Sequence, residues 1–176
     1  MRAGPQFRSS HSGLPERTRP PALADFPFRT IEKLRFADTD RNGHITNSVF
    51  AICCQNARME LLCDPMRVPL PPNGQFVVAR LLLEFRAEMH WPGAVEVGTR
   101  IERVGRSSVT LAQGLFVDEG CVAIAESVVA LMDKASRRST LLPDATAQAL
   151  RAFACASSSV LPRAVMCVNG EASGSE

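Results

Sequence analysis

Three stretches between Phe76 and Val117 alternate between apolar and polar or small side chains, and this pattern constrains the fold more than any other feature of the sequence. A period of two predicts β-strands with one buried face. We expect strands over 76–89, 95–102, 109–117 and 121–132, joined by short turns that end in Gly93, Ser108 and Gly120. The last strand is apolar on both faces, which predicts a central position in an antiparallel sheet.

One long helical segment precedes these strands. Between Ser48 and Leu62 the residues Phe50, Cys54, Ala57 and Leu61 fall on one stripe, and further apolar residues widen it, so we expect the helix to be buried by a sheet wrapped around it. Its polar positions should then face an edge or a partner: Gln55, Asn56, Arg58 and Glu60. An edge strand over 28–35 and a short helix over 143–153 complete an α+β domain.

The chain has 176 residues, of which 45% are hydrophobic, which suits a single domain with a real core. We expect this domain over 28–153. Residues 1–27 are rich in proline, arginine, serine and glycine and predict a disordered extension, and the alanine- and serine-rich residues 154–176 predict a disordered tail.

Several classes of function are disfavoured by composition. A net charge of +2 without a basic stripe argues against nucleic-acid binding, and no apolar run reaches the length of a membrane span. The six cysteines form no C-x-x-C pair and lie mostly in apolar runs, so we interpret them as core or tail residues and not as zinc ligands. We expect a cytoplasmic protein.

The segment from Asp38 to Asn47, with the sequence DTDRNGHITN, concentrates the candidate chemistry. The spacing of Asp38, Asp40, Asn42 and Gly43 matches the opening of a calcium-binding EF-hand loop. However, Val49 stands at the twelfth position, where an EF-hand has a bidentate glutamate, and no second loop of this kind follows. Calcium binding is therefore a weaker alternative, and a plain helix-capping turn explains only part of the pattern.

The same segment, followed by Phe50 and by Asn56-Ala57-Arg58, resembles the D-x-D-x-x-G-H-V-N-N…Y…E-A-R signature of hotdog-fold thioesterases related to 4-hydroxybenzoyl-CoA thioesterase. The resemblance implies a curled antiparallel sheet around one long helix. It also implies hydrolysis of acyl thioesters, with Asp40 as general base or nucleophile, the N–H of Asn47 as oxyanion donor, and Gly43 and His44 in the catalytic loop.

The resemblance also implies binding residues and an assembly. Arg106, Ser107 and Ser108, with Arg137, would hold the phosphates of coenzyme A; the substrate would be an acyl-CoA or an acyl carrier protein thioester, with no cofactor and no metal. The active site would lie between the subunits of a homodimer, or of a tetramer built from it.

Three residues depart from the signature. Gln55 stands where many relatives have a helix glutamate, Phe50 replaces a tyrosine and Thr46 replaces an asparagine. A hotdog protein that binds acyl-CoA without hydrolysing it therefore remains an alternative.

Overall fold

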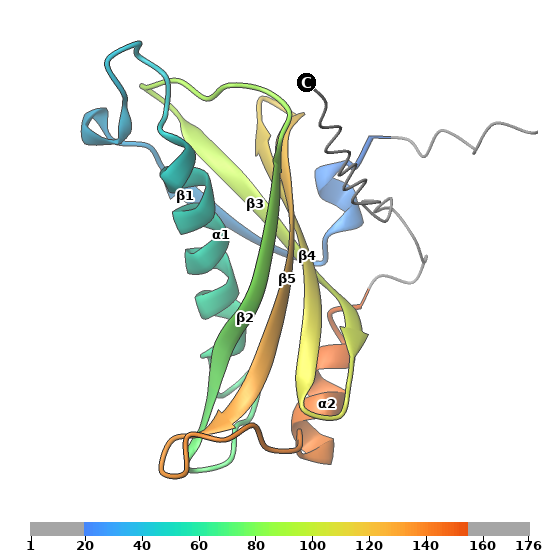
Figure 1. Cartoon of the computed structure of the whole chain (residues 1–176). Helices are drawn as coiled ribbons and strands as arrows, with labels where there is room; N and C mark the ends of the chain where they lie inside the picture. The colour runs from blue at the N-terminus through green and yellow to red at the C-terminus, as the bar shows by residue number, and fades with distance from the viewer. Residues whose placement is uncertain (1–19, 155–176) are drawn as a thin grey trace, which may run out of the picture.

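A five-stranded antiparallel sheet, with the strand order β1-β3-β4-β5-β2, curves around the helix α1 in the computed structural model, which describes residues 20–154 (Figure 1). Together with α1 this sheet makes the hotdog fold that the family resemblance implies. The elements are η1 (Leu23–Asp25), β1 (Phe28–Lys33), η2 (Phe36–Asp38), α1 (Asn47–Leu62), β2 (Gly74–Phe85), β3 (Ala94–Val104), β4 (Ser108–Val117), β5 (Gly120–Asp133) and α2 (Asp144–Arg151).

The expected helix stripe forms the centre of the core. Phe50, Cys54, Ala57 and Leu61 are all buried on α1. The first half of the helix packs against residues of β3, β4 and β5, and its last turn joins a second cluster, which α2 closes through Leu150. Burying a side chain the size of leucine stabilises a fold by about 1.5–3 kcal/mol, so these two clusters hold α1 against the sheet along its whole length.

Arg58 corrects one expectation for this helix. It was predicted to face an edge or a partner, yet it is only 4% exposed. Its guanidinium donates to Oε1 of Gln113 on β4 over 2.9 Å, and the Gln113 amide donates in turn to the carbonyl of Cys54. This partner on the neighbouring sheet makes burial possible, and the burial lowers the pKa of Arg58.

The strand β2 differs most from its predicted form. It was expected to run to Met89 with one buried face, but it ends at Phe85, because the N–H groups of Arg86 and Ala87 both donate to the carbonyl of Val122. The predicted alternation is wrong as well. Because β2 is an edge strand of the sheet, it leaves apolar side chains of both faces exposed: Val77, Val78, Leu81, Leu82 and Phe85.

The remaining elements lie close to their predicted ranges, but the middle residues of β3 and β4 are buried on both faces and not on one. β1 is the opposite edge of the sheet, β5 is an interior strand between β4 and β2, and the turn before β5 is a two-residue hairpin in which Asp118 and Glu119 have φ of 47° and 66°.

The folded part of the chain begins before the predicted boundary at residue 28. Residues 22–26, expected in the extension, pack on the sheet, and Phe26 is 2% exposed. Its ring lies against Gly98 and Gly114, where a Cβ atom would come within about 3 Å of it. The rest of the predicted extension, up to residue 19, and the tail from residue 155 lie outside the described residues.

Candidate active site

Gly43 shapes the loop between η2 and α1. Its φ of +83° lies in the region that residues with a Cβ atom rarely adopt. The turn is closed by two backbone hydrogen bonds, from the Gly43 N–H to the Asp40 carbonyl over 3.1 Å and from the Asp40 N–H to the His44 carbonyl over 2.8 Å. Asp40 and His44 are therefore held side by side at the base of a tight turn.

The Asp40 carboxylate uses its two oxygens differently. Oδ1 accepts the backbone N–H groups of Asn42 over 2.7 Å and His44 over 3.1 Å. No hydrogen bond from the described part of the chain reaches Oδ2. One oxygen thus fixes the orientation of the carboxylate, and the other is free to accept a proton or to attack an electrophile.

Asp38, the first acid of the motif, braces the loop. It is buried, and it accepts the backbone N–H of Arg35 over 2.8 Å and the Arg35 guanidinium over 2.6 Å. The Arg35 side chain, followed by the Arg35 backbone N–H, holds the pKa of Asp38 below its ordinary value.

The amino end of α1 lies directly after the loop. Asn47 is its first residue, and the side chain of Thr46, at the N-cap, makes no capping hydrogen bond to the helix backbone. The N–H groups of a first helical turn have no partner inside the helix and carry the positive end of its dipole. The N–H of Asn47 is therefore suited to stabilise a developing negative charge.

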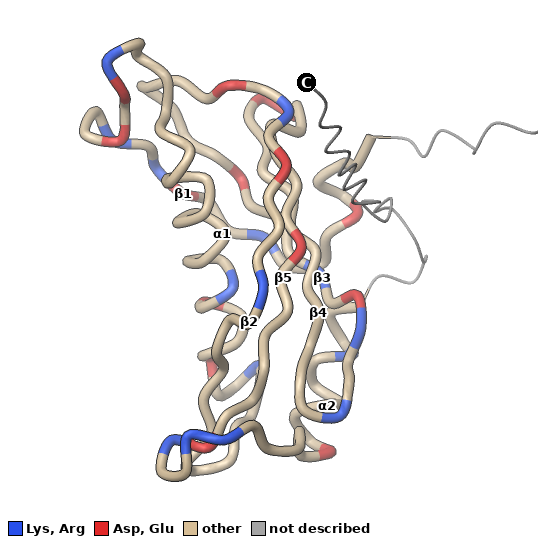
Figure 2. The backbone as a smooth tube through the Cα atoms, viewed as in Figure 1, with Lys and Arg blue, Asp and Glu red and all other residues tan. Residues whose placement is uncertain are grey.

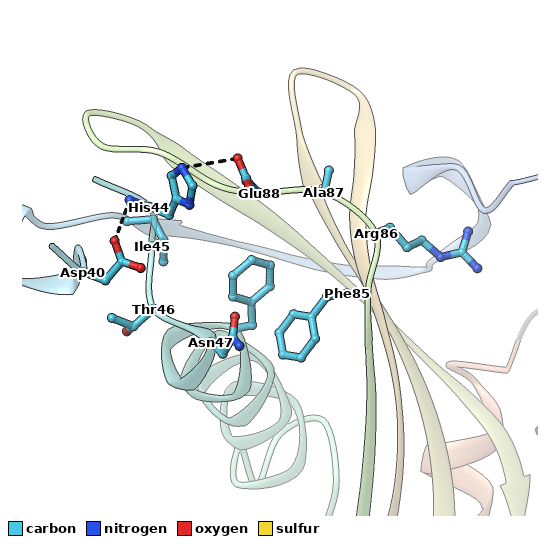
Figure 3. Close-up of a pocket in the computed structure, with 10 residues that line it drawn as sticks. Asp40, His44, Ile45, Thr46, Asn47, Phe85, Arg86, Ala87 and Glu88 are labelled. Atoms are coloured by element: carbon cyan, nitrogen blue, oxygen red, sulfur yellow. Dashed lines mark hydrogen bonds and ion pairs between the residues drawn. The ribbon is translucent and has the colours of Figure 1, made fainter. Parts of the chain in front are cut away.

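A cavity of about 390 Å³ connects these groups (Figure 3). Asp40, His44 and Asn47 line one side of it. Phe50 and Phe85 pack edge to face, with their ring centroids 5.1 Å apart, and form an apolar wall. Polar groups on one side and aromatic rings on the other suit a ligand with a reactive head and an apolar tail.

The opposite side of the cavity comes from a segment that the sequence did not identify. Phe85, Arg86, Ala87 and Glu88 follow the end of β2, and the Glu88 carboxylate lies 3.4 Å from Nε2 of His44. This segment was predicted as the end of a strand. The only sequence signal for a cavity wall there is the change from apolar to polar residues before the turn at residue 90.

Comparison with known proteins identifies the family. A family model described as the Thioesterase-like superfamily matches residues 34–150, which is well over half of the chain. The chain belongs to this superfamily. No curated protein matches it significantly.

This chain covers nearly the whole length of several solved structures of similar fold. The PA5185 protein of Pseudomonas aeruginosa superposes with a TM-score of 0.70 at 23% identity, over 77% of this chain and 97% of that one. A predicted thioesterase from Bacillus stearothermophilus gives 0.66 at 26% identity, over 72% and 96%. A Thermus thermophilus thioesterase solved with coenzyme A and zinc gives 0.64 at 27% identity, over 73% and 95%.

In this superfamily member the expected phosphate-binding residues lie far from Asp40. Arg106, Ser107 and Ser108 form the turn after β3, whose other end begins beside the Asp40 loop. The 11 residues of β3 at ~3.3 Å each separate the two sites by roughly 35 Å. Arg137 lies at the same end as this turn, in the loop after β5, because residues on either side of this loop, Leu131 and Leu142, donate to the carbonyls of Ser107 and Arg106. Lys134 and Arg138 add further positive charge to the loop, and Figure 2 shows a basic segment there. A single chain therefore brings Asp40, Gly43, His44 and Asn47 together and leaves the arginines at the opposite end.

The structure gives no support to a calcium site in the loop. Both carboxylate oxygens of Asp38 accept hydrogen bonds from Arg35. The loop is also preceded by β1 and a short 3-10 turn, where an EF-hand has a helix. Within residues 20–154 no helix is long and apolar enough to cross a membrane.

The cysteines within the described range provide no nucleophile in the core. Burial raises the pKa of the Cys53 and Cys54 thiols to about 12, so both stay protonated at neutral pH.

Proposed function

We propose that this protein hydrolyses acyl thioesters of coenzyme A or of an acyl carrier protein, with Asp40 as general base or nucleophile. The observation that carries the proposal is the pairing of an anchored carboxylate with an uncapped helix start on one cavity. Membership in the thioesterase-like superfamily and the coenzyme A in the Thermus thermophilus relative support the same class of substrate.

The reaction would proceed at the thioester carbonyl carbon. Oδ2 of Asp40 attacks it directly, or removes a proton from a water molecule that does so, and the carbonyl oxygen becomes an oxyanion to which the Asn47 N–H donates. The carbon–sulfur bond then breaks and the thiolate leaves, taking up a proton. If an acyl-aspartate formed first, water would hydrolyse it to the free acid.

His44 and Gly43 position the reacting carboxylate in this scheme. Gly43 permits the turn, and the His44 N–H fixes Oδ1 of Asp40. Gln55 is exposed on α1 and does not line the cavity, so the proposed reaction does not use its side chain.

The carrier phosphates would be held by a second copy of the chain. An edge strand with exposed apolar residues is suited to pair with its own copy, and antiparallel pairing of β2 with β2 reverses the direction of the partner. The Lys134 N–H donates to the Asn73 carbonyl, so the loop that contains Arg137 lies beside the start of β2. Two-fold pairing therefore brings the partner subunit's Arg137 toward Phe85 and the cavity.

The proposed active unit is thus a homodimer, alone or within a tetramer. We expect it to act in the cytoplasm, because thiols such as Cys53 and Cys54 are free.

Thiol release from a panel of acyl-CoA thioesters tests the proposal. Asp40→Asn keeps the shape of the side chain and removes its charge, and we expect turnover to fall at least about a hundredfold, the scale of a positioned acid–base group. Asp118→Asn, at an exposed hairpin outside the cavity, is the matched control and should keep full activity. The assay is run in EDTA and again with calcium.

Two results would refute the proposal. Equal turnover of wild type and Asp40→Asn would exclude Asp40 as the catalytic group. Absence of turnover by the wild type, with an acyl-CoA still raising its melting temperature, would identify an acyl-binding protein that does not hydrolyse its ligand.

A further inference from the structure

Two histidines and one glutamate gather at the rim of the cavity. His44 and His90 face each other across an isolated antiparallel bridge, with ring centroids 5.1 Å apart. The bridge is supported by a hydrogen bond of 2.8 Å from the Ile45 N–H to the Met89 carbonyl. His44 comes from the loop before α1 and His90 from the connection between β2 and β3, so the fold brings together residues that are far apart in the sequence.

Glu88 completes the cluster because of the local backbone pattern. Met89 between Glu88 and His90 is 1% exposed and points into the core, so its two neighbours point away from the core. The Glu88 carboxylate Oε2 lies 3.4 Å from Nε2 of His44 and 3.8 Å from Nε2 of His90. One carboxylate oxygen thus lies between two imidazole nitrogens.

The spacing of these atoms, which is that of two ion pairs, also suits a bound metal ion. All three donor atoms lie within 4.8 Å of one another. Around a tetrahedral ion with metal–ligand distances of about 2.0–2.2 Å, neighbouring ligand atoms are about 3.4 Å apart. Small side-chain rotations would bring the three atoms to that separation.

The donor set also selects the class of metal. Two imidazole nitrogens and one carboxylate oxygen favour zinc and the neighbouring late transition metals, whereas calcium and magnesium require oxygen ligands. Three protein ligands leave a fourth position for water or another small ligand.

We propose that His44, Glu88 and His90 form a binding site for a divalent late transition metal such as zinc. Its ligands are Nε2 of both histidines and the Glu88 carboxylate. His44 and Glu88 also line the cavity, so the ion lies at its rim. The proposal concerns metal binding alone and does not depend on the proposed hydrolysis.

Titration of the metal-free full chain with cobalt(II), followed by zinc competition, tests this site. Cobalt(II) reports tetrahedral coordination through its visible absorption, and its sulfur ligands give separate charge-transfer bands. We expect one cobalt ion per chain with nitrogen and oxygen ligands only, displaced by zinc. Glu88→Gln and His90→Gln should each weaken binding at least about tenfold, since even the loss of a hydrogen bond to a metal-bound side chain weakens metal affinity by about 10- to 100-fold.

Two matched controls should bind cobalt like the wild type. Glu84→Gln changes a carboxylate on the preceding strand, and His11→Gln removes the remaining histidine of the chain. Circular dichroism verifies that each variant is folded.

Three outcomes would overturn the proposal: no cobalt binding by the folded wild type, equal binding by Glu88→Gln and His90→Gln, or sulfur charge-transfer bands that disappear in Cys63→Ser, which removes an exposed thiol.

Discussion

Asp40 owes its orientation to backbone N–H groups and not to a second side chain. Both groups that contact Oδ1, from Asn42 and His44, belong to its own turn. The amide oxygen of an asparagine at this position accepts the same two hydrogen bonds. Asp40→Asn therefore separates the charge of the carboxylate from its structural role, and a loss of activity in that variant reports on chemistry.

Glu119 carries backbone strain that a single substitution should relieve. Its φ of 66° lies in the left-handed region, at the second position of a two-residue hairpin where glycine is strongly preferred. We expect Glu119→Gly to raise the free energy of unfolding by about 0.5–1 kcal/mol, as measured by urea denaturation.

A matched variant separates the backbone effect from the charge. Glu119→Ala removes the carboxylate and keeps a Cβ atom, so its stability should stay within about 0.5 kcal/mol of the wild type. If Glu119→Ala raised the free energy of unfolding as much as Glu119→Gly does, the charge of Glu119, and not its φ, would be what destabilises the wild type.

At the scale of elements, the ion pair between Arg35 and Asp38 joins the end of β1 to the turn that leads into the Asp40 loop. Because the folded protein lowers the pKa of Asp38 below its ordinary 3.8, the ionised carboxylate stabilises the fold above that pH. This contribution is lost as the pH falls through the lowered pKa of the folded state.

Arg35→Gln should therefore lower the melting temperature at neutral pH, and its difference from the wild type should shrink below about pH 3.8. Arg41→Gln, at an exposed position of the next loop, should match the wild type throughout. Thermal melts across the acid range measure both. A difference that stayed constant to the lowest pH would show that Arg35 acts by packing alone.

Sequence reasoning succeeded where the determinants are local. The extents of β3, β4 and β5, the hairpin at Asp118 and the apolar stripe of α1 are all set by nearby residues. It failed for β2, because burial there depends on which strand lies alongside, and for Arg58, because its partner Gln113 is on another element.

The candidate site shows the same division. The sequence placed Asp40, Gly43, His44 and Asn47 in one loop. In the structure three of these residues line the cavity, and Gly43 shapes the turn without lining it. Glu88 and His90 were not predicted beside His44, because only the tertiary bridge between two loops brings them together. The roles of these residues and of Arg106, Ser107, Ser108 and Arg137 remain predictions.

At the scale of the whole molecule, the exposed apolar residues of β2 make the assembly testable. Leu82 is 40% exposed. In a β2–β2 dimer a lysine at this position would lie in the interface, either against the same lysine of the second copy or in a place from which water is excluded. We expect Leu82→Lys to raise the dimer dissociation constant at least about a hundredfold, as measured by sedimentation equilibrium.

Met66→Lys provides the comparison, because Met66 is 91% exposed in the loop before β2. It should leave the sedimentation behaviour unchanged. A wild type that sediments as a monomer at all concentrations would contradict the assembly and the shared site together.

Mixed dimers test whether two subunits build each site. Asp40→Asn and Arg137→Ala chains should each be weakly active alone, the second through a raised KM. When the two are unfolded together and refolded, one site of each mixed dimer keeps both residues intact. Random pairing should then recover about a quarter of wild-type activity, as isologous symmetry requires. Recovery of no activity would place both residues in the same subunit's site.

The open edge of β2 also affects the newly made chain before the proposed dimer forms. Its 12 residues contain no proline or lysine, which commonly protect free edges, and its outer backbone groups are open to any extended peptide. If the proposed dimer forms, a newly made subunit is open to amyloid-like strand addition until a second copy covers this edge. The yield of soluble protein should then depend on how fast two nascent chains meet, so the surface that would complete the proposed site is also the one on which synthesis can fail.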